Sequence, residues 1–291
     1  MAGTIPVRVK TIKQTDKRAL KGSSITQVIL TLIALMFFAL FLMIPLISVF
    51  VKGFEKGVKV YFAAISDPMA LKAIKLTLFT IAIVVPINTV FGLTAAWAVA
   101  KFKFKCKNLL ITIIDLPFAI SPVVAGLIFV LLFSTSHGLL APLLNAWGIK
   151  IIFAPPGIII ATLFVTMPFV ARELIPLMEA QGTAEEEAAL TLGASGFKTF
   201  LLITLPNIKW ALLYGIILTA ARAAGEFGAV SVVSGHIRGL TNTMPLHVEI
   251  LYNEYQFSSA FAVASLLTVI SIINLVIKNI SDWKIKQQSR V

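Results

Sequence analysis

The amino-acid sequence predicts an all-α integral membrane protein with six transmembrane helices. Hydrophobic residues make up 58% of the 291 residues and charged residues only 13%, which is more apolar surface than a soluble domain can bury. The apolar residues form long runs, and crossing the hydrocarbon core of a bilayer takes about 20 of them. The net charge is +12, and most of the excess lies in short segments between those runs.

The first apolar run follows a polar, basic segment at 1–27, which we expect to be a cytoplasmic N-terminal tail. The run is longer than the apolar region of a secretory signal, about 7–15 residues, so we expect a retained helix and one transmembrane domain over 28–291. The fourth run is the shortest, and we expect it to extend back towards Ile151. Prolines inside the runs predict kinks, which packed membrane helices tolerate. The six runs are 28–51, 76–100, 109–133, 158–170, 211–233 and 257–277.

Lysine and arginine residues gather in alternate segments between the runs. They are most frequent in the segments that face the cytoplasm if the N-terminus does, and Lys101, Lys103, Lys105 and Lys107 form one such cluster. The positive-inside rule therefore predicts that both termini are cytoplasmic. Phenylalanines between these lysines also allow a nucleic-acid site, but a loop anchored at the lipid headgroups explains them better, so no nucleic-acid partner is expected.

The longest inner loop, 172–209, has the composition of helices rather than of a linker. Residues 185–190 are strong helix formers, and Thr183 with Glu186 matches a capping box at the start of that helix. Gly193 should end the helix, and apolar residues then recur at helical spacing up to a proline. We therefore predict a cytoplasmic helix, a glycine turn and a second short helix that leads into the membrane.

The same loop contains a fixed register of residues: Glu-Ala-Ala, three residues, glycine, nine residues, isoleucine, one residue and Leu-Pro. This register resembles the cytoplasmic signature of ABC importer permeases. The resemblance implies the ABC importer permease fold and a coupling loop that docks on an ATP-binding subunit. An ordinary solvated helix with an acidic face is the plainer interpretation, but the complete spacing favours docking. The residues concerned are Glu187, Ala188, Ala189, Gly193, Ile203, Leu205 and Pro206.

Further segments narrow the resemblance to the sulfate/thiosulfate permeases, and to the second of their two subunit types. The resemblance implies a bacterial inner-membrane assembly with a second permease subunit as a heterodimer, ATP-binding subunits, and a periplasmic or extracellular sulfate/thiosulfate-binding protein. A molybdate or other oxyanion permease remains an alternative, as do an ion-coupled secondary carrier and a non-transporting scaffold. The segments are 115–126, 221–229, 234–239 and 245–251.

The sequence offers no group for catalysis. The segment 193–199 lacks the glycine that precedes the lysine of a phosphate-binding loop, so ATP hydrolysis is expected on a separate subunit. The single cysteine is Cys106, and the three histidines contain no pair at helical i, i+4 spacing. We therefore expect no metal site, no cofactor and no catalytic residue.

Arg222 and Glu226 are charged residues inside the fifth run, four residues apart and so on one face of a helix. Counted from Ala211, Arg222 lies about 17 Å into the membrane. The pair is either a structural ion pair or part of an anion path in which Glu226 holds Arg222. His236 and Arg238 would lie at the outer mouth, where they either meet an anion or binding protein or form a solvated loop.

Asp115 is the remaining charge inside a predicted membrane run. It pairs either with a cytoplasmic lysine or with another helix, and the sequence leaves both partners open.

Overall fold

The computed structural model describes residues 24–288, which form helices without any strand. The chain divides into two compact units, 1–48 and 49–291. The first unit contains α1 (Ser24–Phe38), the π-helical segment η1 (Ala39–Met43) and the start of α2 (Ile44–Phe54). Residues 1–23 of the predicted basic tail lie outside the described residues.

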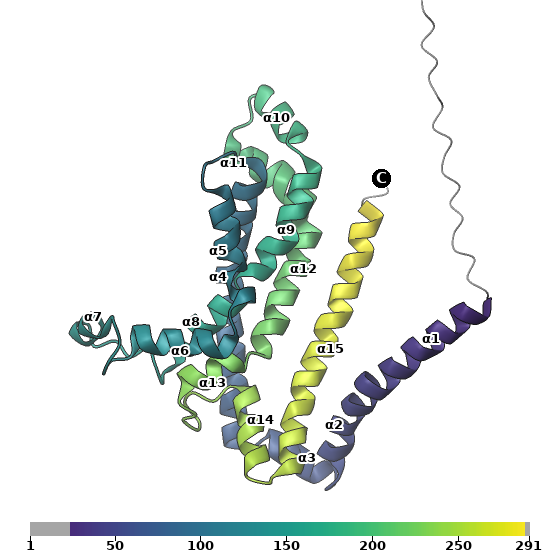
Figure 1. Ribbon diagram of the computed structural model, residues 1–291, viewed down its shortest axis with the longest axis vertical. Helices are drawn as coiled ribbons and strands as arrows, with labels where there is room; N and C mark the ends of the chain where they lie inside the picture. Colours follow the sequence, from purple (N-terminus) through teal and green to yellow (C-terminus); the bar gives the residue numbers. More distant parts are fainter. Residues whose placement is uncertain (1–23, 289–291) are drawn as a thin grey trace, which may run out of the picture. The chain divides into compact units, whose positions relative to one another are not determined.

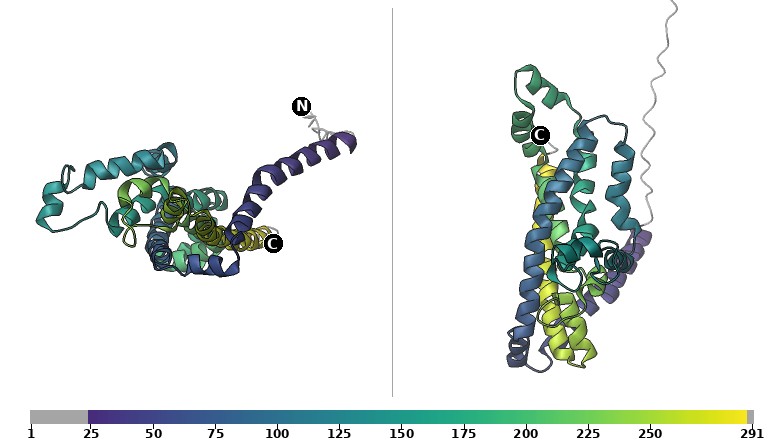
Figure 2. Two further views of the ribbon diagram at one scale, coloured as in Figure 1. Left: turned by 90° about the horizontal axis from the view of Figure 1, so that it is seen from below. Right: turned by 90° about the vertical axis from the view of Figure 1, so that its left-hand side faces the viewer.

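The second unit contains the remaining helices (Figures 1 and 2). In chain order these are α3 (Val58–Ile65), α4 (Pro68–Lys101), α5 (Lys107–Ala119), α6 (Pro122–Phe133), α7 (Ala141–Ala146), α8 (Pro155–Thr166), α9 (Pro168–Gln181), α10 (Ala184–Thr191), α11 (Gly196–Thr199), the π-helical segment η2 (Phe200–Thr204), α12 (Leu205–Ala224), α13 (Gly228–Ser234), α14 (Met244–Asn253) and α15 (Phe257–Gln288).

Five helical stretches among the described residues are long and apolar enough to cross a membrane, and a sixth span arises if the bent pair α5 and α6 counts as one. This agrees with the predicted all-α fold and its six spans. The five stretches are Thr26–Phe54, Pro68–Lys101, Pro155–Gln181, Gly196–Ala224 and Phe257–Ile277.

The third predicted helix, 109–133, is not continuous, because α5 and α6 meet at an angle of 107°. Ile120 and Ser121 both have extended backbone angles, with ψ of 130° and 135°. A residue that precedes a proline avoids the helical region, and Pro122 occupies the first turn of α6. The prolines therefore produce a break here, where the sequence predicted only a kink.

The fourth and fifth helices also differ from their predicted ranges. The fourth span begins at Pro155 rather than near Ile151 and continues through α9 to Gln181, so the connection that follows is shorter than 172–209. The fifth span begins already at Gly196 and ends at Ala224. The predicted helix over 211–233 is therefore two helices, α12 and α13.

The core of the second unit lies where α4, α9 and α12 pack together. Gly92 of α4 and Gly215 of α12 allow this approach, since a Cβ on either would lie 2.6 Å or 3.1 Å from atoms of Val170 in α9. In Figure 1, α10 and α11 lie at one end of this unit, and α3 and α14 lie at the other. The long helix α4 runs between the two ends (Figures 1 and 2).

Candidate functional site

The connection between α9 and α12, residues 182–204, forms a hairpin: the helix α10, a glycine turn, and the segment α11 and η2, which runs on into the fifth span. The sequence predicted this order of helix, turn and second helical segment. Gly182 ends α9 with φ of +67°, and Gly193 turns the chain after α10 with φ of +89°. The Gly193 N–H donates to the carbonyl of Leu190 and the Ala194 N–H to that of Ala189, each at 3.0 Å. A positive φ favours glycine, which explains why the turn falls at this residue.

The predicted capping box at the start of α10 is wrong. The Thr183 hydroxyl makes no capping bond to the backbone and instead donates to Oε1 of Glu187 at 2.7 Å. Glu186 does not turn back to the backbone of Thr183, because it has a charged partner in Lys101. An ammonium group is a stronger donor to a carboxylate than a neutral N–H.

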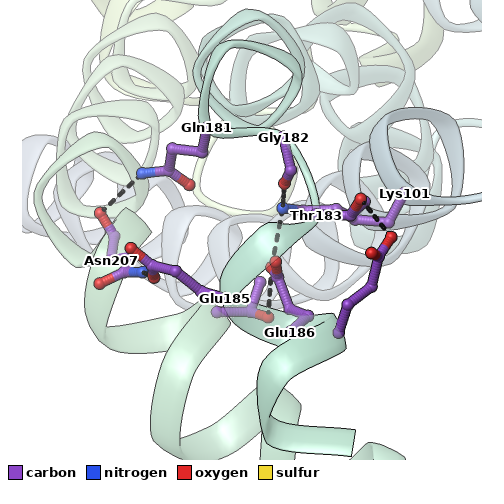
Figure 3. A network of polar contacts seen from close by, with 9 residues as sticks. Lys101, Gln181, Gly182, Thr183, Glu185, Glu186 and Asn207 are labelled. Carbon is purple, nitrogen blue, oxygen red and sulfur yellow. Dashed lines mark hydrogen bonds and ion pairs between the residues drawn. The ribbon is translucent and has the colours of Figure 1, made fainter. Parts of the chain in front are cut away.

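Lys101, the last residue of α4, reaches into the base of the hairpin (Figure 3). Its Nζ lies 2.7 Å from Oε1 of Glu186 and also donates to the carbonyl of Gly182. Thr204 of η2 donates to the same Glu186 oxygen at 3.1 Å. Burial acts to raise the pKa of Glu186, but the hydrogen bonds and the charge of Lys101 outweigh it, so this pKa lies below its usual value.

The residues of the Glu-Ala-Ala register lie along α10, the turn and the start of the fifth span. Glu187, Ala188 and Pro206 are exposed, Ala189 is buried, and Ile203 and Leu205 are half-buried. Large apolar side chains are also exposed on this hairpin. An exposed apolar patch is typical of a surface that another protein covers. These side chains are Leu190, Leu192, Phe197, Leu201 and Leu202.

Arg222 and Glu226 form the ion pair that the sequence suggested, with Nη1 and Oε2 2.5 Å apart. Their predicted setting is wrong, because Arg222 lies in the last turn of α12 and Glu226 lies beyond the helix end. Oε1 of Glu226 accepts a hydrogen bond from the N–H of Ala229 at 2.9 Å, in the first turn of α13. Only 1% of the Glu226 side chain is exposed, compared with 34% for Arg222. A buried carboxylate thus holds a guanidinium that remains partly open.

His236 and Arg238 lie in the connection between α13 and α14, at the end of the unit opposite the hairpin. Both are exposed; Arg238 pairs with Glu254, and Nδ1 of His236 is 3.8 Å from Oε2 of Glu249. The carboxylates that they approach are thus in or beside α14.

Asp115 pairs with another helix, which resolves the choice that the sequence left open. Its Oδ1 accepts from Nε of Arg172 in α9 at 2.7 Å, and the guanidinium of Arg172 lies 5.2 Å from the centre of the Phe118 ring. Arg172 was predicted to lie in the inner loop, but α9 continues to Gln181, beyond the end of the apolar run at residue 170.

His247 was not predicted as a site residue, because a single histidine in a sequence does not indicate a binding site. It is 6% exposed and lines a cavity of about 330 Å³ together with Asp67, Arg238 and Glu254. Burial lowers the pKa of His247, and the opposing charges of Asp67 and Glu254 only partly offset this. Across residues 24–288, no group of three or more His, Cys, Asp or Glu side chains could hold a metal ion.

Comparison with known proteins gives one consistent result. Residues 88–287 match the family model described as binding-protein-dependent transport system inner membrane component. The chain is 49% identical to the sulfate transport system permease protein CysW of Escherichia coli over 87% of its length and 86% of that protein. It is 52% identical to CysW of Synechococcus elongatus, over 89% and 90% of the two chains.

The other subunit type is less similar. Identity to the sulfate transport system permease protein CysT of Escherichia coli is 34%, over 83% of this chain and 87% of that protein. Among solved structures, a chain of a bacterial alginate ABC transporter in complex with an alginate pentasaccharide-bound periplasmic protein superposes with a TM-score of 0.73. That match is 17% identical over 88% of this chain and 92% of the other, and so concerns the fold alone.

These matches, the helical fold and the complete Glu-Ala-Ala register agree. The chain belongs to the family of binding-protein-dependent transport system inner membrane components, the multi-pass inner-membrane permeases of ABC importers, and within it to the CysW-type sulfate transport system permease proteins.

Proposed function

We propose that this chain is one of two pore-forming subunits of an ATP-driven importer for sulfate or thiosulfate. The observation that carries the proposal is the hairpin, which presents the Glu-Ala-Ala register and exposed apolar side chains at one end of the membrane helices. ATP hydrolysis takes place on a separate ATP-binding subunit that docks there. Closure of that subunit displaces the hairpin, and the helices change between states that bind the substrate differently.

The remaining partners follow from the relatives' names. The second pore subunit is of the CysT type, so the pore is a heterodimer, and an external binding protein delivers the anion. Both termini and the hairpin face the cytoplasm. The positive-inside pattern supports this orientation, and so does the ion pair between Lys107 and Glu179 at 3.0 Å, which joins the lysine-rich loop to the end of α9 from which the hairpin continues.

Arg222 serves the anion path within this pore. Its guanidinium is partly exposed, and Glu226 fixes its position from the buried side. An arginine held in this way presents N–H donors that match the oxygens of a tetrahedral anion. His236 and Arg238 meet the anion or its binding protein at the outer mouth.

The test is reconstitution of the chain with its partner subunits in proteoliposomes. Sulfate uptake should require ATP, the ATP-binding subunit and the binding protein together. Uptake driven by an ion gradient without the ATP-binding subunit would support the secondary carrier and refute the proposal. Molybdate transported in preference to sulfate would support the other oxyanion permease, which the names of the relatives do not favour.

A further inference from the structure

The ion pair between Lys101 and Glu186 joins segments that are far apart in the sequence. Lys101 ends α4, Glu186 lies in the first turn of α10, and Gly182 connects α9 to the hairpin. With Thr204 of η2, four helical segments meet at one ammonium group and one carboxylate. Figure 3 shows the side chains of Lys101 and Glu186 pointing towards one another from their separate helices.

The burial of this pair separates it from an ordinary surface salt bridge. The Lys101 side chain is 6% exposed and that of Glu186 17%. A lysine near the headgroups would normally extend its ammonium into water. Here the ammonium points inward and has two acceptors, so its direction is fixed by the hairpin.

On the side of the hairpin next to α4, Trp97 contacts Phe200 of η2 with ring centroids 4.9 Å apart, but the space between α4 and α10 is not filled. A cavity of about 310 Å³ lies beside the pair, lined by Trp97 and Phe102 on one side and by Leu190 and Phe200 on the other. The helix α10 packs on α11 and η2, whereas α9 and α12 pack directly on α4. The link between α10 and the end of α4 therefore depends on the ion pair more than on apolar packing.

We propose that Lys101 and Glu186 are positioning residues that fasten the hairpin to α4, so that movement of the hairpin is passed to a helix that reaches the opposite end of the second unit. This inference rests on the proposed function, because it assumes that an ATP-binding subunit moves the hairpin. It means that α4, in addition to α9 and α12, transmits the movement of the hairpin to the membrane helices; α9 and α12 continue directly into the hairpin.

The decisive measurement is the amount of sulfate transported per ATP hydrolysed by the reconstituted complex. Lys101→Met should keep the complex and its ATP hydrolysis but lower this ratio about tenfold, within the usual range of coupling between sites. The matched control is Lys107→Met, which removes a more exposed ion pair at the same end, with side chains 33% and 46% exposed. The control should leave the ratio unchanged.

A cross-link distinguishes fastening from general folding. Lys101→Cys and Glu186→Cys, in a Cys106→Ser background, can be joined by a short bismaleimide. The cross-linked double variant should transport as much sulfate per ATP hydrolysed as the wild type. The same variant without the cross-link should keep the lowered ratio. If Lys101→Met fails to assemble, recovery of both assembly and ratio by the cross-link supports the inference, and no recovery overturns it.

A ratio for Lys101→Met within about twofold of wild type would also overturn the inference, because typical coupling between sites is larger than that. Failure of the proposed function is a separate result. In that case the wild-type chain would not bind the ATP-binding subunit or would not transport sulfate, whatever residue stands at position 101.

Discussion

Replacing Arg222 and Glu226 singly and together tests whether the arginine serves the anion or only the structure. The three variants are Arg222→Ala, Glu226→Ala and the double substitution. The two residues differ in burial, because 1% of the Glu226 side chain is exposed and 34% of the Arg222 side chain. The two single substitutions therefore have different costs.

Arg222→Ala leaves a buried carboxylate without its counter-charge, which costs about 3–5 kcal/mol. Glu226→Ala leaves an arginine that stays partly hydrated, so its main loss is the hydrogen bond from the Ala229 N–H, about 1.5–3 kcal/mol for a charged acceptor. The double substitution loses that bond but strands no charge. The double variant should therefore be destabilised by about 3–5 kcal/mol less than the sum of the two single effects, because the cost of the stranded carboxylate is absent.

Assembly is measured as the yield and thermal midpoint of the complex purified with its partner subunits, and function as sulfate uptake in proteoliposomes. Arg172→Ala is the matched control, since its partner Asp115 is 33% exposed and its loss strands a less buried charge. Arg222→Ala should assemble worst, and the double variant should assemble but not transport. If the double variant transports sulfate at the normal rate, Arg222 has no role in the anion path.

The other predictions concern orientation, the hairpin turn and the packing of α6. Cys106 is exposed and is the only cysteine, and its loop is proposed to face the cytoplasm. A membrane-impermeant thiol reagent should therefore label it only in permeabilised cells. Labelling in intact cells would show that the proposed orientation is wrong. Gly193→Val should cost about 1–3 kcal/mol of backbone strain, because the residue has φ of +89°, and should lower sulfate uptake without loss of membrane insertion. The control Gly196→Ala has open space around it and should leave uptake unchanged. Normal binding of the ATP-binding subunit and normal transport by Gly193→Val would contradict the docking role of the hairpin. Gly126→Ala would place a Cβ 2.8 Å from the carbonyl oxygen of Ala229, so the yield of monodisperse protein should fall, and an unchanged yield would show that α6 can move away from α13 at little cost.

The spans and the hairpin could be predicted from the sequence because each depends on a local physical requirement. A bilayer demands about 20 apolar residues for each crossing, and the runs at 76–100 and 257–277 fall within α4 and α15. The turn at Gly193 follows from a backbone angle that glycine adopts most readily. Neither prediction needed information about which helices pack together.

Prolines could not be interpreted with the same success. The sequence predicted kinks at the prolines inside the runs. Pro122 instead begins a separate helix after the 107° bend, whereas Pro86 and Pro117 lie inside helices and Pro168 lies inside the continuous span Pro155–Gln181, at the interruption between α8 and α9. A proline at a helix start loses no hydrogen bond, and one in the interior loses one. The close contact of Gly228 with Pro122, 3.0 Å for an added Cβ, shows that packing between α6 and α13 accompanies the break at this proline.

The charged residues were misplaced for a related reason, which is that they lie where helices end. Spacing along one helix predicted the pair of Arg222 and Glu226, yet the pair forms across the break after α12, where Glu226 also satisfies a free N–H at the start of α13. Lys101 likewise ends α4, and its partner lies far along the chain in α10. A helix end offers unpaired backbone groups and a change of direction, so a charge placed there can join two helices. Where one apolar run covers two helices, the hydrophobic pattern of the sequence does not show where the first helix ends. Such junctions can be located only in the folded structure.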